Sequence, residues 1–177
     1  FEGYTDDKVA GEAIWQTWID GLNVRDNGAQ VGYLQPHYAE QTIVHGGSQS
    51  MPFLYVNEAG VTNSEASMTL TAPRDWTIGA VSELSLWFGG DSANATEPLY
   101  VAISDAAGAP AIVAYDDAAI AARSRWTEWR IALQAFADQG IDLANVDKMV
   151  IGLGSKAGAA AGGTGTVYID DIRLYQP

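Results

Sequence analysis

The sequence predicts an all-β fold, a two-sheet antiparallel β-sandwich of jelly-roll type in which residues 1–177 form one domain. Short segments with period-two alternation, rich in Val, Ile, Thr and aromatic residues, recur along the chain between turn signals. The 19 glycines among 177 residues suit many tight turns better than a few long helices. Strands without alternating helices exclude a doubly wound α/β fold and favour a sandwich.

About ten segments satisfy the strand criteria of alternation, composition and flanking turn residues. They are Ala13–Ile19, Gln41–Val44, Ser50–Val56, Ala66–Thr71, Glu83–Phe88, Leu99–Ser104, Ala111–Tyr115, Trp126–Leu133, Lys148–Leu153 and Thr166–Tyr175. Helix is expected only as one or two short turns, at Leu133–Gln139 and Asp117–Arg123. We also expect the first residues to pair with the last strand and so close the sandwich.

Alternation assigns faces within two of these strands. Leu84, Leu86 and Phe88 share one face, which leaves Trp87 on the opposite face. The same period sets Tyr100 apart from its aliphatic neighbours. Large aromatic side chains on an outer sheet face mark interaction sites. We therefore expect Trp87 and Tyr100, on presumed neighbouring strands, to form a ligand-binding groove with Arg74 beside them.

A second group of aromatic, amide and charged side chains lies between residues 15 and 38. It consists of Trp15, Trp18, Asp20, Asn23, Arg25, Tyr33, Gln35, His37 and Tyr38. Sugar recognition needs a flat ring over the apolar face of a pyranose and polar groups that satisfy its hydroxyls. Since loops often carry binding residues, we expect a pocket at the sandwich rim to which Trp18, Tyr33, His37 and Tyr38 contribute.

Composition restricts the class of partner. With 9 Lys and Arg against 22 Asp and Glu, the formal net charge is -13, which repels nucleic acid phosphates and anionic lipid headgroups. No apolar run reaches the roughly 20 residues of a membrane span. The absence of cysteine excludes disulfides, thiolate metal sites and a cysteine nucleophile. We expect no nucleic acid or membrane partner, and a neutral or lightly charged ligand.

Catalytic motifs are missing. A glycosidase needs two carboxylates at a fixed separation, and no Glu-x-Asp-x-Glu pattern occurs. Glu128 and Arg130 share a strand face and are typical of a surface pair or a ligand contact. His37 beside Tyr38 is the only acid/base combination of the kind that a polysaccharide lyase uses, with Arg25 or Arg74 as the neutraliser of a substrate carboxylate.

Asp170 needs a compensating partner. Strict alternation in the last strand puts it on the face of Tyr168, Ile172 and Leu174, where an ionised carboxylate is costly. Calcium is the natural candidate, with Glu2 as a second carboxylate and carbonyls from the turn at residues 45–50. Alternatively, Asp170 and its neighbour Asp171 cap a strand edge with solvated charge.

Several short motifs resemble carbohydrate-binding modules of the galactose-binding-like β-sandwich superfamily. They are Phe1-Glu2, His45-Gly46-Gly47-Ser48-Gln49-Ser50-Met51, Tyr168-Ile169-Asp170-Asp171-Ile172 and the stretch Trp126–Leu133. Modules of this kind are typically attached to secreted bacterial polysaccharide-degrading enzymes. The resemblance implies a structural calcium ion held by Glu2, by carbonyls near Gly46 and Ser48, and by Asp170.

Together these observations predict a non-catalytic carbohydrate-binding module that binds a polysaccharide or oligosaccharide by aromatic stacking and hydrogen bonding. We expect it to contain structural calcium, to be secreted or on the cell surface, and to be part of a larger multidomain protein. Two alternative functions fit the same sequence. One is a structural or adhesive surface module that binds protein, and the other is a small polysaccharide lyase or glycosidase.

Overall fold

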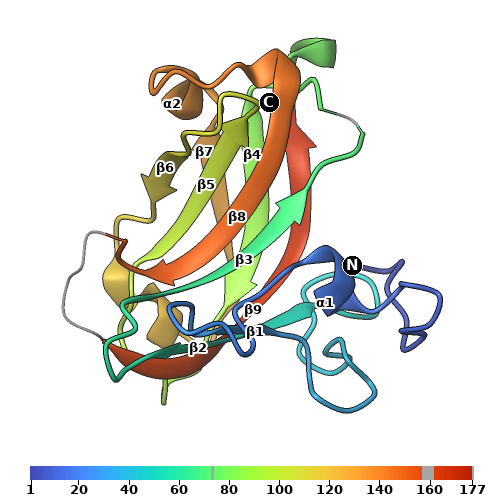
Figure 1. Cartoon of the computed structure of the whole chain (residues 1–177), viewed down its shortest axis with the longest axis vertical. Coiled ribbons are helices and arrows are strands. Elements are labelled where there is room, and N and C mark those ends of the chain that lie inside the picture. The colour runs from blue at the N-terminus through green and yellow to red at the C-terminus, as the bar shows by residue number, and fades with distance from the viewer. Residues whose placement is uncertain (73, 157–161, 177) are drawn as a thin grey trace.

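The computed structural model describes residues 1–72, 74–156 and 162–176. Its architecture is a two-layer β-sandwich in which every strand pairing is antiparallel, with one five-stranded and one four-stranded sheet (Figure 1). The all-β, jelly-roll-like fold class is therefore confirmed, with nine strands among the described residues.

The five-stranded sheet has the order β1-β2-β9-β4-β7. Its strands are β1 (Ala29–Val31), β2 (Met51–Asn57), β9 (Gly163–Tyr175), β4 (Glu83–Gly89) and β7 (Thr127–Ala132). The short strand β1 is an edge strand that alternation did not reveal, because three residues are too few to show a period.

The four-stranded sheet has the order β3-β8-β5-β6. Its strands are β3 (Asn63–Thr69), β8 (Val146–Gly154), β5 (Leu99–Asp105) and β6 (Ala111–Ala114). Figure 1 shows β3, β8 and β5 in front of β4 and β9. The consecutive strands β4 and β5 thus belong to different sheets, which decides where their outward-facing aromatic residues lie.

The helical pieces are short. They are α1 (Ile14–Thr17), η1 (Ile78–Ala80), η2 (Ala118–Ala122), α2 (Gln134–Ala137) and η3 (Leu143–Asn145). The helical turns expected near residues 117–123 and 133–139 are confirmed by η2 and α2. None of the helices among the described residues is long and apolar enough to span a membrane.

Two strand predictions are wrong. The segment 13–19 forms α1 and then a single bridge from Ile19 to Ser67. Ile14 and Trp18 are four residues apart and both buried, which is the spacing of one helical face. The segment 41–44 makes no strand; only Glu40 beside it bridges to Ser50.

The core lies between the sheets and takes alternate residues from each strand. Leu84, Leu86 and Phe88 from β4 meet Leu99 and Ile103 from β5, and all five side chains are buried. The face assignments made from alternation in these two strands are confirmed. Truncating one of these side chains to alanine costs about 2–5 kcal/mol.

The expected pairing of the first residues with the last strand is wrong. Strand β9 pairs with β2 on one side and β4 on the other, and no strand includes residues 1–4. In Figure 1 the C-terminus lies at one end of the sandwich, away from the N-terminal loops. The N-terminal segment instead reaches β9 through an intervening turn at residues 45–49.

A β-bulge in β9 corrects the face of Asp170. The step from Ser85 to Trp87 on β4 matches the step from Arg173 to Asp170 on β9, so β9 carries one extra residue. Asp171 absorbs it with a left-handed φ of 46°. Asp170 therefore lies on the outer face, whereas Ile172, two residues later, packs against the core.

Candidate functional site

The outer face of the five-stranded sheet carries an aromatic cluster. Trp87 is half-buried there, and the ring of His45 stacks on it with centroids 3.7 Å apart and planes 14° apart. Trp126 meets the same histidine edge-on, with centroids 5.7 Å apart. We call Trp87, His45 and Trp126 the aromatic platform. The outward position predicted for Trp87 is confirmed.

The turn that carries His45 is held in place by both aspartates of β9. The backbone N–H of His45 donates to Asp170 Oδ2 at 2.9 Å, and the His45 ring Nδ1 lies 2.8 Å from Asp171 Oδ2. The bulge turns the two consecutive carboxylates toward one turn. The platform is therefore positioned before any ligand arrives, which lowers the entropic cost of binding.

Polar side chains stand beside the platform. Glu128, which is opposite Trp87 on β7, accepts hydrogen bonds from Ser85 Oγ at 2.9 Å and Arg130 Nε at 3.1 Å. These two hydrogen bonds hold the pKa of Glu128 below its ordinary value, and the bond from Arg130 has the larger effect. The Arg130 guanidinium lies 4.6 Å from the centre of the Tyr175 ring. The face thus offers rings together with fixed donors and acceptors.

Tyr100 and Arg74 do not join this face, so the predicted groove is wrong. Tyr100 is on the outer face of the other sheet and only 4% exposed. Its ring covers Gly152, where a Cβ atom would lie 2.2 Å from Tyr100 Cζ. Its hydroxyl donates to Glu65 Oε1 at 2.7 Å. Arg74 is bound to β8, through the Val146 carbonyl at 3.1 Å and Asp147 at 3.0 Å.

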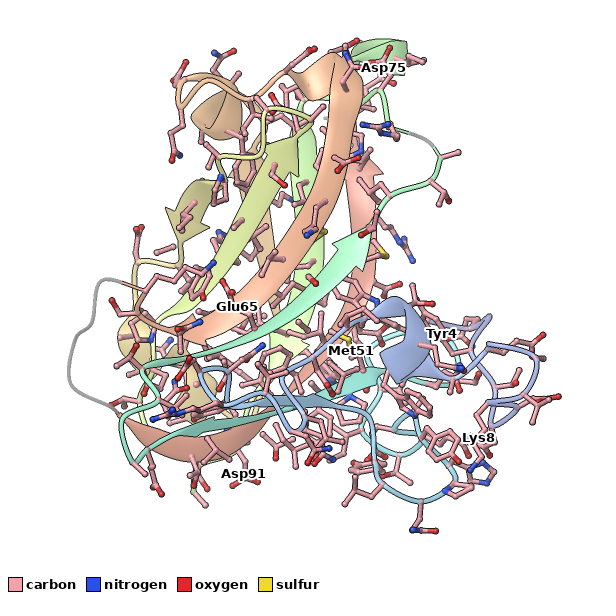
Figure 2. The ribbon with its side chains drawn as sticks, viewed as in Figure 1. Tyr4, Lys8, Met51, Glu65, Asp75 and Asp91 are labelled. Atoms are coloured by element: carbon pink, nitrogen blue, oxygen red, sulfur yellow. The ribbon has the colours of Figure 1, made fainter. Side chains whose placement is uncertain are left out.

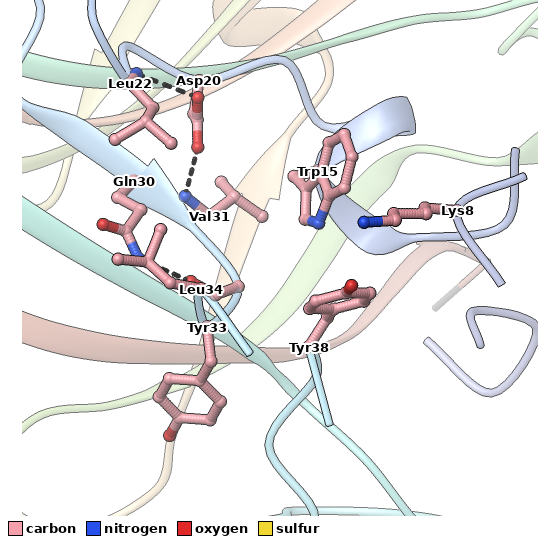
Figure 3. Close-up of a pocket in the computed structure, with 10 residues that line it drawn as sticks. Lys8, Trp15, Asp20, Leu22, Gln30, Val31, Tyr33, Leu34 and Tyr38 are labelled. Carbon is pink, nitrogen blue, oxygen red and sulfur yellow. Dashed lines mark hydrogen bonds between the residues drawn. The ribbon is translucent and has the colours of Figure 1, made fainter. Parts of the chain in front are cut away.

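The predicted pocket at the rim exists, with a partly different lining (Figure 3). This rim pocket has a volume of about 250 Å³ and is lined by Lys8, Trp15, Asp20, Leu22, Gln30, Val31, Gly32, Tyr33, Leu34 and Tyr38. It lies beside the edge strand β1.

Of the four residues expected in this pocket, only the two tyrosines line it. Trp18 is 2% exposed and packs in the core with Phe1, so it is not available to a ligand. His37 is exposed, but its ring Nδ1 lies 2.6 Å from Asp6 Oδ2. The Tyr38 ring packs edge-on against Trp15. The His37 and Tyr38 rings thus contact different residues and are not arranged as the acid/base pair that a lyase needs.

Tyr33 connects the rim to the sheet face through Glu40. Its hydroxyl donates to the Glu40 carboxylate, which also accepts from Thr42 and from the N–H of Ile43. Burial acts to raise the pKa of Glu40, but the hydrogen bonds from Thr42, Tyr33 and Ile43 outweigh it and hold that pKa at about 2. Burial and Glu40 raise the pKa of Tyr33.

The residues proposed to hold calcium do converge, but on N–H groups. Glu2 accepts from the backbone N–H of Ser48 at 3.1 Å and from its hydroxyl. Asp170 Oδ2 accepts from the N–H groups of His45 and Gly46, at 2.9 and 3.1 Å. Among the described residues no group of three or more His, Asp or Glu side chains could hold a metal ion. As arranged, this donor set does not fit calcium, and treatment with EDTA is the test of the calcium site that the resemblance implies.

Several residues of these sites were missed from sequence. Trp126 precedes Glu128 and Arg130 at period two, so its place on their common face was readable from alternation. His45 was singled out only as part of the turn at residues 45–50, and its contact with Trp87 joins residues too far apart in the chain for any local pattern to show. No pattern in the sequence around Lys8 predicts that this residue lines the rim pocket.

Comparison with known proteins supports the architecture. No protein-family model and no curated protein matches the sequence. A family 30 carbohydrate-binding module is similar at a TM-score of 0.59 and 14% identity, over 85% of this chain and 92% of that one. The family 11 module from Clostridium thermocellum, in complex with a β-1,3-1,4-mixed-linked tetrasaccharide, gives 0.55 and 17% over 84% of each chain. An exo-β-agarase gives 0.59 and 14%, over 86% of this chain but 22% of its own. Likenesses at this identity show the fold.

Proposed function

We propose that this chain is a non-catalytic carbohydrate-binding module and that it binds glycans on the outer face of the five-stranded sheet. The observation that carries the proposal is the aromatic platform, in which the His45 ring stacks on Trp87 and Trp126 meets that histidine edge-on, outside the core. The His45 side chain remains 28% exposed and Trp126 is half-buried, so both rings reach solvent.

The proposed mechanism is stacking combined with hydrogen bonding. A pyranose places its C–H face on Trp126 or His45, because aromatic rings bury such apolar surface well. The neighbouring Glu128 and Arg130, whose side chains are 29% and 43% exposed, supply an acceptor and donors for the hydroxyl groups. No residue is assigned a catalytic role.

The proposal extends to the biological setting of the domain. The similar family 11 and family 30 structures are carbohydrate-binding modules, and the exo-β-agarase is matched over only 22% of its length. These likenesses support a role as the targeting domain of a larger extracellular protein that acts on polysaccharides. The net charge of -13 favours a neutral glycan over a sulfated one.

Affinity electrophoresis tests the proposal. The chain is run in gels that contain a β-1,3-1,4-mixed-linked glucan, agarose, xylan or galactomannan, with albumin as the non-binding control. We expect retardation by at least one of these neutral polysaccharides, and no new reducing ends or unsaturated products after incubation with it. Absence of retardation in every gel would favour an adhesive protein-binding module. Release of products would establish an enzyme.

A further inference from the structure

We propose that the rim pocket is a second sugar-binding site, separate from the aromatic platform, which takes one terminal pyranose residue of a neutral glycan. The inference rests on the proposed carbohydrate-binding function, but the two sites can be tested independently. The pocket's shape, its unpaired donors and the fixation of its loops each support it.

The shape of the pocket suits a single ring. Its volume of about 250 Å³ lies below the roughly 300–1,000 Å³ of pockets that hold drug-sized ligands, so an extended oligosaccharide does not fit inside. Trp15 and Tyr38 form one wall, with ring centroids 6.0 Å apart and planes 78° apart. Leu22 and Leu34 also line it, and Leu34 is 65% exposed. These side chains provide the apolar surface on which a pyranose face can pack.

Three hydrogen-bond donors of this lining have no partner. No hydrogen bond joins Lys8 Nζ, Trp15 Nε1 or Tyr38 Oη to another of the residues that the structure describes. Figure 3 shows the Lys8 ammonium beside the indole nitrogen of Trp15, above the Tyr38 ring. All three donors reach solvent, so the hydroxyl oxygens of a sugar can replace water as their acceptors.

An acceptor is also present in the pocket. The Gln30 amide nitrogen donates to the Gly32 carbonyl at 2.9 Å, which leaves the Gln30 side-chain oxygen to accept from a hydroxyl. The Asp20 carboxylate, by contrast, is engaged by the N–H groups of Val31 at 2.6 Å and Leu22 at 3.0 Å. Asp20 thus closes the edge of β1, while Gln30 serves the ligand.

The loops that carry these groups are fixed by bonds outside the pocket. Gln16 donates to the Lys8 carbonyl at 3.0 Å, which secures the Lys8 backbone against α1. Asp6 accepts from the N–H of Tyr38 at 3.0 Å and contacts His37, so the N-terminal loop is tied to the loop after β1. The pocket is preformed, as small-molecule sites usually are.

Indole NMR separates the two sites. In ¹⁵N spectra, the parent is titrated to about 50 mM with the methyl glycosides of glucose, galactose, mannose and xylose, which mimic terminal residues. We expect a saturable shift of the Trp15 indole with at least one. Lys8→Met is expected to weaken that binding about tenfold, the loss of one charge-assisted hydrogen bond. Lys148→Met, at an exposed lysine on β8, is the matched control and should change nothing.

The outcomes distinguish this inference from the proposed function. If all four glycosides leave Trp15 unshifted, or if Lys8→Met binds like the parent, the rim pocket is not a sugar site. The proposed function still stands in that case if a polysaccharide that retards the chain in the gels shifts the NMR signal of the Trp126 indole. If Trp15 responds and Trp126 does not respond to any glycan, the platform is refuted and the rim pocket is the site.

Discussion

Each outer face of the sandwich carries an aromatic residue that points away from the core, but only one of these two residues belongs to an open surface. Trp87 on β4 and Tyr100 on β5 each follow aliphatic core residues at period two, and each points away from the core. Trp87 becomes part of an open aromatic platform, whereas Tyr100 is sealed against Gly152 and Glu65. Alternation tells which way a side chain points, and the covering segments decide whether a ligand can reach it.

The covering segments differ in what holds them. On the five-stranded side, the turn at residues 45–49 is bound by Glu2 from the N-terminal segment and by Asp170 and Asp171 from β9. On the four-stranded side, Lys156 reaches over to Glu65 at 2.8 Å and completes the polar contact of Tyr100. Figure 2 shows Glu65 on β3, well apart from Lys8 in the N-terminal loops. The first arrangement presents aromatic rings to solvent, whereas the second buries the Tyr100 ring.

The largest stability effect is expected at Asp170, which is 2% exposed and accepts three N–H bonds. In Asp170→Asn, an amide group replaces one oxygen and faces donors, so we expect a loss of about 3 kcal/mol in the free energy of unfolding. Urea unfolding at pH 7 measures it. Asp116→Asn, at an exposed aspartate on the sandwich surface, is the control and should change little.

The same unfolding curves test calcium. Because the carboxylates of Glu2 and Asp170 are engaged by N–H groups, we expect EDTA to leave the urea midpoint unchanged. A drop in the midpoint with EDTA that calcium reverses would establish the metal site implied by the sequence resemblance. It would contradict the interpretation that N–H groups alone satisfy the carboxylates of Glu2 and Asp170.

Only the local features of the fold and of the candidate site could be predicted from the sequence. The sandwich, the core face of β4 and the outward position of Trp87 follow from period two, which is a local property. The prediction that Trp87 and Tyr100 lie on one face was wrong. Strands β4 and β5 are consecutive in the chain but belong to different sheets, and the order of strands in the sequence does not show where the chain crosses from one sheet to the other. Asp170 was put on the wrong face, because a bulge at Asp171 breaks the period.

The next largest effect concerns Glu40 on the five-stranded side. Its pKa of about 2 in the folded chain lies below the ordinary 4.5, so its contribution to stability is full above about pH 4.5 and is lost as the pH falls toward 2. We expect the parent to lose on the order of 2 kcal/mol more than Glu40→Gln between pH 6 and pH 2.5. Urea unfolding at both pH values measures this, and parallel losses in the two proteins would contradict it.

The smallest effect is expected on the four-stranded side. Tyr100→Phe removes one hydroxyl that donates to Glu65 and leaves the ring over Gly152. We expect a loss of about 1 kcal/mol in the free energy of unfolding and an unchanged affinity for glycans. Weaker glycan binding by this variant would mean that the four-stranded face takes part in recognition, and the contrast between the two faces would be wrong.

The most direct test of the account is the affinity of Trp126→Ala for the polysaccharide that retards the parent, measured by isothermal titration calorimetry. Ile112→Ala is the matched control, since Ile112 is an exposed apolar residue on the outer face of the four-stranded sheet. Thermal melting followed by circular dichroism verifies that both variants fold. We predict at least about tenfold weaker binding for Trp126→Ala, as for a stacking residue at the centre of an interface, and parent-like binding for Ile112→Ala. Parent-like affinity of a folded Trp126→Ala would contradict the assignment of the five-stranded face as the binding surface.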